Sequence, residues 1–269
     1  MSWITAKRRR PVARFAVVLL GLILVGAIYA TITGSGDSSA STAPTTSQAE
    51  IAKGQQIFNQ TCSSCHGLQA QGTSAAPSLI GVGSAAVDFQ VSTGRMPAKA
   101  LDAEQPGAPR KLDAKETHAV AAYIQSLGGG PTIPTPAEVS TSGADLALGQ
   151  QLFTANCAQC HNFDGAGGAL TYGKYAPALT NATPTQIYEA MLTGPEAMPV
   201  FNNTTITPNE KRAIIAYVTT SRVTPNPGGF SLGRVGPVTE GLVAFLGLLF
   251  FMVLAALWIT AKHRKTTDE

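Results

Sequence analysis

The sequence predicts a mainly helical protein, in which two copies of one small helical domain lie between an N-terminal and a C-terminal transmembrane helix. Two observations lead to this fold class. Two uncharged apolar stretches bracket the chain, and each is close to the length of about 20 residues with which a helix crosses a bilayer. The polar region between them contains an internal repeat, which is the usual mark of a duplicated domain.

The two apolar stretches cover residues 15–33 and 241–261, and the transmembrane helices are predicted over 15–33 and 238–261. Basic residues are concentrated outside them, in the N-terminal segment 1–14 and the C-terminal tail 262–269. Positive charge favours the cytoplasmic side, so both termini are expected in the cytoplasm and the region between the helices on the outer face of the cell membrane. A cleaved signal peptide is the alternative for the first stretch, and a buried core helix for the second.

The region between the apolar stretches divides at segments rich in Gly, Pro, Ser and Thr. Segments 34–49, 128–143 and 223–237 have little to bury and are predicted to be linkers. They separate two domains, at 50–127 and 144–222. Residues 34–237 carry 13 acidic and 11 basic side chains, and the whole chain has a net charge of only +3, which argues against a nucleic-acid partner.

The two domains are repeats of each other. Seven of 14 positions are identical between 54–67 and 149–162. Ala-Pro-x-Leu follows at 76–79 and 176–179, and a Thr-Gly pair followed by Met-Pro lies further along each copy. Helical spacing predicts first helices over 51–59 and 146–154 and last helices over 116–127 and 210–219, with Asp113 and Thr207 as N-caps. The stretch between them shows no strand pattern and is predicted to be a long irregular loop.

Each repeat contains a C-x-x-C-H motif, formed by Cys62, Cys65 and His66 in the first and Cys157, Cys160 and His161 in the second. This motif is typical of covalent haem c attachment, in which two thiols form thioethers and the histidine binds the iron. A planar apolar haem would also complete the core of a small domain that is mostly loop. We therefore predict two covalently bound haem c groups. Zinc and disulfides are the alternatives for the cysteines.

The iron needs a second axial ligand, and a methionine thioether favours the ferrous state. Met96 lies 30 residues after His66, and Met198 lies 37 residues after His161. Both are followed by proline, which restricts the preceding backbone. The iron ligands are therefore predicted to be His66, Met96, His161 and Met198. A carbonyl near Pro77 or Pro177 is expected to orient each imidazole. The rival candidates are Met191, expected to be a helix residue, and His118, expected to face solvent.

On these motifs, each repeat resembles a class I cytochrome c domain. The first helix with Gly54 and Phe58 (Gly149 and Phe153) and the last helix with Tyr123 (Tyr217) also match that family, in which these helices cross at the glycine and the aromatic residues. The arrangement of the whole chain resembles the dihaem cytochrome c subunit of the actinobacterial cytochrome bcc complex, a quinol–cytochrome c reductase and translocase.

That resemblance implies an electron carrier with no catalytic residues of its own. Electrons would arrive from a Rieske iron–sulfur protein after quinol oxidation at cytochrome b, and would leave to a terminal haem–copper oxidase. Two alternatives are weighed against it. One is the dihaem cytochrome subunit of another membrane oxidoreductase, such as an oxidase or dehydrogenase. The other is a haem-based sensor or peroxidase, which requires one iron with an open face and therefore one methionine that is not a ligand.

Overall fold

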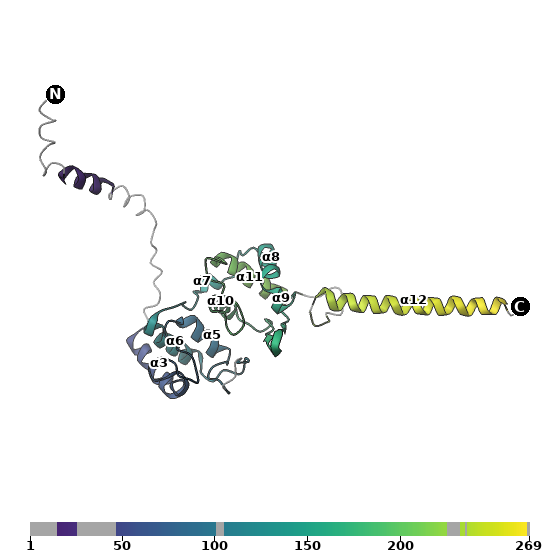
Figure 1. Cartoon of the computed structure of the whole chain (residues 1–269), viewed down its shortest axis with the longest axis horizontal. Helices are drawn as coiled ribbons and strands as arrows, with labels where there is room; N and C mark the ends of the chain where they lie inside the picture. The colour runs from purple at the N-terminus through teal and green to yellow at the C-terminus, as the bar shows by residue number, and fades with distance from the viewer. Residues whose placement is uncertain (1–14, 26–46, 101–104, 225–231, 235, 268–269) are drawn as a thin grey trace, which may run out of the picture. The chain divides into compact units, whose positions relative to one another are not determined.

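The computed structural model describes residues 15–25, 47–100, 105–224, 232–234 and 236–267 (Figure 1). The chain divides into two compact units, Met1–Thr45 and Thr46–Glu269. Within the first unit, Phe15–Val25 form an apolar helix. The rest of the predicted span 15–33 lies outside the described residues, so the structure does not confirm an N-terminal helix long enough to cross a membrane.

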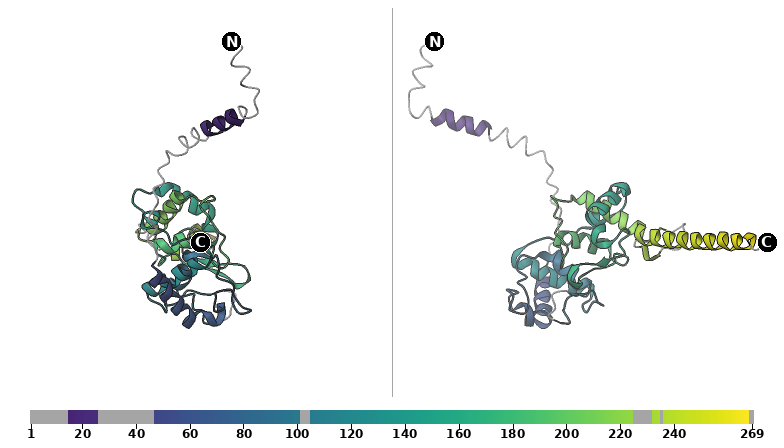
Figure 2. Two further views of the ribbon diagram at one scale, coloured as in Figure 1. Left: turned by 90° about the vertical axis from the view of Figure 1, so that its left-hand side faces the viewer. Right: turned by 45° about the vertical axis from the view of Figure 1, so that its right-hand side comes forward.

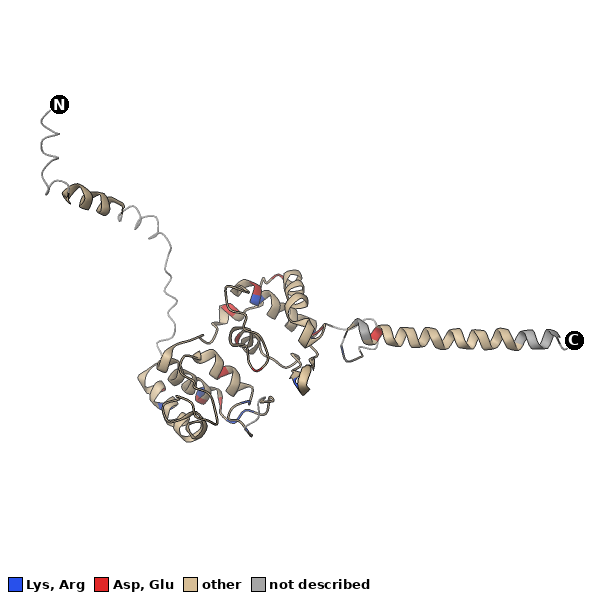
Figure 3. Cartoon of the chain, viewed as in Figure 1, with Lys and Arg blue, Asp and Glu red and all other residues tan. Residues whose placement is uncertain are grey.

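The C-terminal apolar stretch is one unbroken helix, α12 (Pro237–Thr267) (Figures 1 and 2). Its section Thr239–Ala261 has a mean hydropathy of 2.8, and none of it is buried in the isolated chain. Glu240 lies near its start, and Figure 3 shows no further charged residue along this section. Among the described residues, α12 alone is long and apolar enough to cross a membrane, as expected for the segment 238–261.

The first domain contains α3 (Gln48–Thr61), α4 (Ser63–His66), α5 (Gly83–Ser92) and α6 (Ala114–Gly128). The second contains α8 (Leu146–Asn156), α9 (Ala158–His161), α10 (Pro184–Thr193) and α11 (Pro208–Ser221). The predicted first and last helices are thus confirmed. Asp113 and Thr207 each form a capping box with the glutamate three residues later, as expected for N-caps.

In each domain the first and last helices cross at a glycine. A Cβ atom on Gly54 would lie 1.9 Å from the carbonyl oxygen of Ala119, and one on Gly149 would lie 2.0 Å from that of Ala213. No other residue allows so close an approach of two helix backbones. One turn further on, an aromatic pair packs across the same crossing in each domain. The rings of Phe58 and Tyr123, and those of Phe153 and Tyr217, have centroids 5.4 Å apart.

The loop predicted between these helices is wrong in one respect, because each copy contains a further helix, α5 or α10. Seven of the ten residues of α5 are buried, over most of its circumference. A helix buried on most sides has no wide polar stripe and therefore shows little amphipathic period in its sequence. The helix expected around Met191 is confirmed as α10.

The second domain also contains a small hairpin, although no strand was predicted. β1 (Gly168–Ala169) pairs antiparallel with β2 (Tyr175–Ala176), and the 3-10 turn η1 (Thr171–Gly173) connects them. Two-residue strands are too short to show an alternating pattern in a sequence. The first domain has no such hairpin in its described residues, and the separation between motif histidine and proline is correspondingly shorter there, 11 positions against 16.

The segment between the domains, 128–143, makes specific contacts on both sides. It includes the short helix α7 (Pro136–Val139). The backbone N–H of Ile133 donates to Ser84 Oγ of the first domain at 3.2 Å. The guanidinium of Arg212, in the second domain, donates to the carbonyls of Ser140 and Ser142 at 2.9 Å each. These bonds hold the connecting segment against the two domains that it joins.

Candidate haem sites

Each C-x-x-C-H motif begins where the first helix of its domain ends. Cys62 is the C-cap of α3, and its N–H donates to the carbonyl of Phe58 at 2.8 Å. Cys157 ends α8 in the same way, with a bond of 2.8 Å to Phe153. One further helical turn then carries the second cysteine and the histidine in each motif. The shared residues of the repeat thus produce the same local structure twice.

The four cysteines are free thiols and form no disulfide. Burial raises the pKa of Cys62 to about 11, and the neighbouring Cys65 thiol adds to the rise. The pKa of Cys157 is raised to about 11 for the same two reasons, with Cys160 as its neighbour. Among the described residues, no three His, Cys, Asp or Glu side chains gather in a metal-binding cluster, so the ligand set of a zinc site is not formed there.

Both motif histidines are oriented by a proline carbonyl, as predicted. His66 Nδ1 lies 2.8 Å from the carbonyl oxygen of Pro77, and His161 Nδ1 lies 2.9 Å from that of Pro177. A carbonyl only accepts hydrogen bonds, so Nδ1 carries the proton in each ring. This tautomer leaves the lone pair of Nε2 available to a metal, and the hydrogen bond fixes the ring that would present it.

The two imidazoles differ in their exposure. His66 is 7% exposed, whereas His161 is only partly buried. Burial nonetheless lowers the pKa of His161, and the hydrogen bond to Pro177 partly opposes this effect. A lowered pKa favours the neutral imidazole, which is the form that binds a metal.

The predicted axial methionines both pack against the core of their own domain. Met96 contacts the cluster around Phe58 and Tyr123, and Met198 contacts the cluster around Phe153. The rival Met191 is 2% exposed and lies inside the core on α10.

The longer spacing from histidine to methionine in the second domain has a structural origin. Its seven extra residues are the five of the hairpin region and the two that precede Met198.

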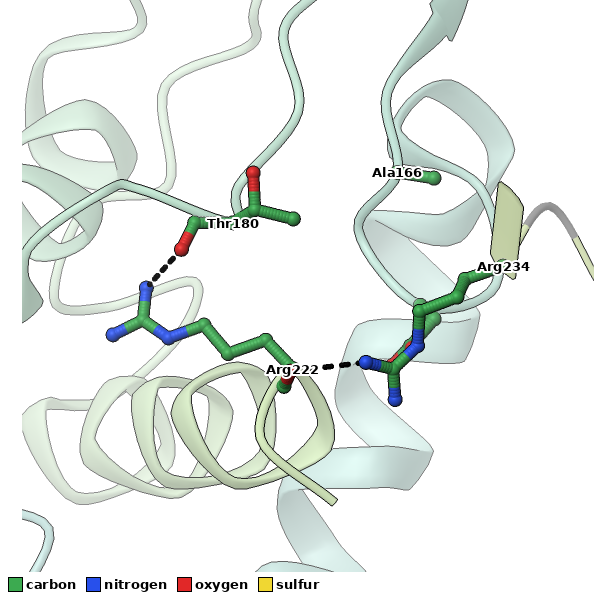
Figure 4. Close-up of a pocket in the computed structure, with 5 residues that line it drawn as sticks. Ala166, Thr180, Arg222 and Arg234 are labelled. Carbon is green, nitrogen blue, oxygen red and sulfur yellow. Dashed lines mark hydrogen bonds and ion pairs between the residues drawn. The ribbon is translucent and has the colours of Figure 1, made fainter. Parts of the chain in front are cut away.

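A pocket elsewhere on the second domain contains none of the predicted site residues. It is lined by Asp164, Ala166, Thr180, Arg222 and Arg234 (Figure 4). The Arg222 guanidinium donates to Thr180 O at 3.1 Å and to two neighbouring carbonyls. Arg234 pairs with Asp164 at 2.5 Å and donates to the carbonyl of Arg222 at 2.9 Å. Because protein oxygens already occupy both guanidinium groups, the pocket is a structural junction and does not present free positive charge.

The donor atoms of each domain fit a c-type haem. Each domain supplies two thiols and an imidazole within five residues, and the hydrogen bond at Nδ1 leaves Nε2 as the metal-binding nitrogen. A methionine thioether and the first cysteine of the motif pack against the same apolar cluster. One nitrogen and one sulfur ligand in an apolar setting are the donors of a haem iron that transfers electrons.

Two charged residues of the interior are absent from the predicted sites. Asp88 and Glu189 are both buried, on α5 and α10. The signal in the sequence is a single acidic residue inside an otherwise apolar run, VDFQV or IYEAML. An acidic residue in such a run can be predicted to be buried only when the run is known to be a helix packed in the interior.

Comparison with known families defines the class of protein first. Residues 51–128 match the family model of cytochrome c, and residues 144–218 match that of cytochrome c oxidase, cbb3-type, subunit III. The protein therefore contains two cytochrome c domains, which bind haem c covalently.

Similarity over the whole chain then defines the family. The cytochrome bc1 complex cytochrome c subunit of Corynebacterium diphtheriae is 40% identical, over 95% of this chain and 96% of its own length. The subunit of the same name from Mycobacterium tuberculosis is 43% identical, over 94% and 92%. The cbb3-type cytochrome c oxidase subunit FixP of Bradyrhizobium is 31% identical over 48% of the chain. The chain belongs to the family of cytochrome c subunits of the cytochrome bc1 complex, and it is an electron-transfer subunit of a respiratory bc complex.

Proposed function

We propose that the chain binds two haem c groups, one in each domain. Cys62 and Cys65 would hold the first through thioethers, and Cys157 and Cys160 the second. The observation that carries this proposal is the repeated hydrogen bond from the histidine Nδ1 to a proline carbonyl, at 2.8 and 2.9 Å. Two unrelated uses of the motif would not require the same tautomer in both copies.

The axial ligands proposed are His66 and Met96 for the first haem and His161 and Met198 for the second. When bound, each haem would supply one-electron chemistry at its iron. The protein holds the imidazole by its hydrogen bond and presents the thioether from an apolar cluster, which favours the ferrous state. If Met96 and Met198 hold the iron together with His66 and His161, no position would be left for a substrate, which supports electron transfer as the function.

Mutation of one motif at a time tests the number of haem groups. Replacing both cysteines of one motif, Cys62→Ala with Cys65→Ala or Cys157→Ala with Cys160→Ala, should abolish covalent attachment at that site, because no thiol remains there to form a thioether. The measurement is the haem content of the purified protein from its pyridine haemochrome spectrum, together with a haem-stained gel. A variant that kept both haem groups fully attached would refute the proposal.

The proposed partners are cytochrome b, a Rieske iron–sulfur protein and a terminal haem–copper oxidase. The chain would accept electrons from the Rieske protein and deliver them to the oxidase. The whole-chain similarity to cytochrome c subunits of the cytochrome bc1 complex supports this assembly. Purification of the tagged protein in mild detergent is the test. Copurification of the cytochrome b and Rieske subunits is expected, and their replacement by a dehydrogenase would sink the proposal.

The proposed topology has two membrane spans, with both termini in the cytoplasm and both haem domains on the outer face. The basic residues at both ends of the chain and the apolar section of α12 support it. A single cysteine placed in the tail, as Thr266→Cys, should react with a membrane-permeant reagent and not with an impermeant one in intact cells. Labelling by the impermeant reagent would place the C-terminus outside.

The alternative proposal, a subunit of another membrane oxidoreductase, is favoured by one observation. The second domain matches the cbb3-type subunit III model. That match covers one domain, whereas the similarity to cytochrome bc1 subunits extends over nearly the whole chain. The copurification experiment distinguishes the two, because an oxidase subunit would be recovered without cytochrome b.

A further inference from the structure

The two cytochrome c domains contact each other through equivalent helices. α5 of the first domain packs against α10 of the second (Figure 1). Two hydrogen bonds also join the domains. Gln186 Nε2 donates to Ser92 Oγ at 3.2 Å, and the backbone N–H of Gln105 donates to Glu196 Oε1 at 3.2 Å. Contacts of this kind usually allow domains to move relative to each other unless something further holds them.

Two carboxyl groups, Asp88 on α5 and Glu189 on α10, interact with each other across this contact. Asp88 of α5 is 7% exposed, and Glu189 of α10 is fully buried. Neither carboxyl oxygen of Glu189 receives a hydrogen bond from any donor in the described part of the chain. Two carboxylates can only accept hydrogen bonds, so one can bond to the other only when one of them carries a proton.

No cation among the described residues pairs with Glu189. The basic group beside Asp88 is His118 of α6, with Nε2 3.7 Å from Asp88 Oδ1 and a side chain that is 56% exposed. From α11, Lys211 Nζ instead donates to the Ile206 carbonyl at 2.5 Å and to Asn203. From α7, Glu138 receives a hydrogen bond from Tyr188. Arg95, which follows α5, stacks over Phe89 and interacts with Glu196.

These surroundings favour one shared proton. Burial raises the pKa of Glu189 to about 10, and the charge and hydrogen bond of Asp88 add to this effect. Burial also raises the pKa of Asp88, while His118 and the hydrogen bond with Glu189 lower it. The pair thus has the physical character of two carboxyls that cannot both ionise in a low-dielectric site. Asp88, which lies beside His118, is the member expected to be ionised.

We propose that Asp88 and Glu189 form a proton-binding site between the two cytochrome c domains, and that loss of the shared proton loosens the contact between α5 and α10. The proton acts as a ligand of the docked arrangement, because separation of the domains would expose both carboxyls to water. His118, exposed and in contact with Asp88, lies on the path by which a proton reaches the pair. Neither carboxyl group belongs to the proposed haem sites.

The direction of the pH dependence follows from linkage. Glu189 in the docked domains binds its proton more tightly than Glu189 in separated domains, where the ordinary value of 4.5 applies. Below about pH 4.5 both states are protonated and the docked state has its full stability. As the pH rises toward about 10, only the docked state still holds the proton, so the equilibrium constant for docking falls by up to about tenfold per pH unit.

Infrared spectroscopy of the haem-loaded full-length protein tests the proton directly. At about pH 8 an isolated glutamate would be ionised, so the C=O stretch of a protonated carboxyl at that pH reports the shared proton. We expect this band in the wild type, and we expect Glu189→Gln to lack it. Absence of the band in the wild type at about pH 8 would overturn the proposal.

Spin labels test the effect on the domains. Gln55→Cys and Gln150→Cys place labels at equivalent exposed positions of α3 and α8, and attached haem occupies the four native cysteines. With gadolinium labels, pulsed EPR should show a narrow distance distribution at about pH 6 that broadens toward about pH 9 in the wild type. Glu189→Gln should stay narrow at both values, because its amide donates to Asp88 without a titrating proton.

Glu138→Gln is the matched control. It removes one negative charge by the same chemistry from a residue that also contacts α10, and glutamine retains the capping box of α7. This variant should broaden with pH as the wild type does. Asp88→Asn provides a second test, since its amide can donate to Glu189, and it should suppress the broadening. If Glu189→Gln and Asp88→Asn both broadened like the wild type, the carboxyl pair would not control the contact.

Discussion

The two cytochrome c domains agree closely at the helix crossing and around the motif histidine, and they differ elsewhere. The glycine crossing, the aromatic pair and the histidine–proline hydrogen bond have nearly the same geometry in both. The hairpin from Gly168 to Ala176 occurs in the second domain only, and Lys211 is fully buried there at the position that Thr117 occupies in the first. The comparison shows that the residues suited to hold haem are positioned by the same crossing of the first and last helices in both domains. An insertion such as the hairpin leaves this crossing unchanged.

The largest expected effect distinguishes Met198, the proposed iron ligand, from Met191, the buried core methionine of the same domain. Met198→Ala should abolish one of the two far-red Met–iron absorption bands and lower one reduction potential, because the iron loses its thioether. Met191→Ala should keep both bands but reduce the free energy of unfolding of this domain by about 2–5 kcal/mol, since it leaves a cavity. Absorption spectra and chemical denaturation measure the two effects.

Met96→Ala extends the same test to the first domain. It should remove the other far-red band and leave the band of the second domain unchanged. If Met191→Ala abolished a band and Met198→Ala did not, the axial assignment in the second domain would be reversed. If either ligand variant left both bands intact, that methionine would not be a ligand.

The helix crossing predicts that replacing its glycine lowers the free energy of unfolding by a similar amount in both domains. Gly54→Ala and Gly149→Ala each place a Cβ about 2 Å from a backbone carbonyl oxygen, so the helices must separate. We expect each substitution to cost about 1–3 kcal/mol or more of the stability of its own domain. Urea denaturation followed by circular dichroism measures this loss, with the α12 substitution Gly247→Ala as a control in which the added Cβ meets no neighbouring atom. A large loss in one domain only would show that the crossings are not equivalent.

A smaller difference is expected between the two tyrosines of the last helices. Tyr217 donates through its hydroxyl to the carbonyl of Phe163 at 3.3 Å. The structure gives Tyr123 no equivalent bond in the described part of the chain. Tyr217→Phe should therefore cost about 0.5–1.5 kcal/mol of unfolding free energy, and Tyr123→Phe less. Thermal unfolding of the two variants measures the difference, and equal costs would contradict the asymmetry.

The smallest effect concerns the tip of the hairpin. Tyr172 is 99% exposed and has a left-handed backbone conformation, with φ 58°. Tyr172→Gly should leave the haem spectrum unchanged and should not lower the melting temperature, because glycine adopts this conformation without strain. Calorimetry and absorption spectroscopy check both points. A clear loss of haem from the second domain would show that the hairpin supports the site.

Much of the candidate site could be predicted from the sequence because it depends on short-range chemistry. A C-x-x-C-H motif places its donors within one helical turn, and Met-Pro and the histidine-bonding proline are recognisable in both copies. Repetition strengthened each of these assignments, since chance matches do not recur in the same order. Helix ends at Asp113 and Thr207 were equally accessible, because capping boxes are local.

Other features required the three-dimensional structure. α5 is buried on most sides, so its sequence lacks the polar stripe by which helices are recognised. The hairpin is too short to show a period. Asp88 and Glu189 are about 100 positions apart, and either one alone would be taken for a surface carboxylate. Only the packing of one helix against the other removes both from water, and burial together is what makes them compete for a single proton.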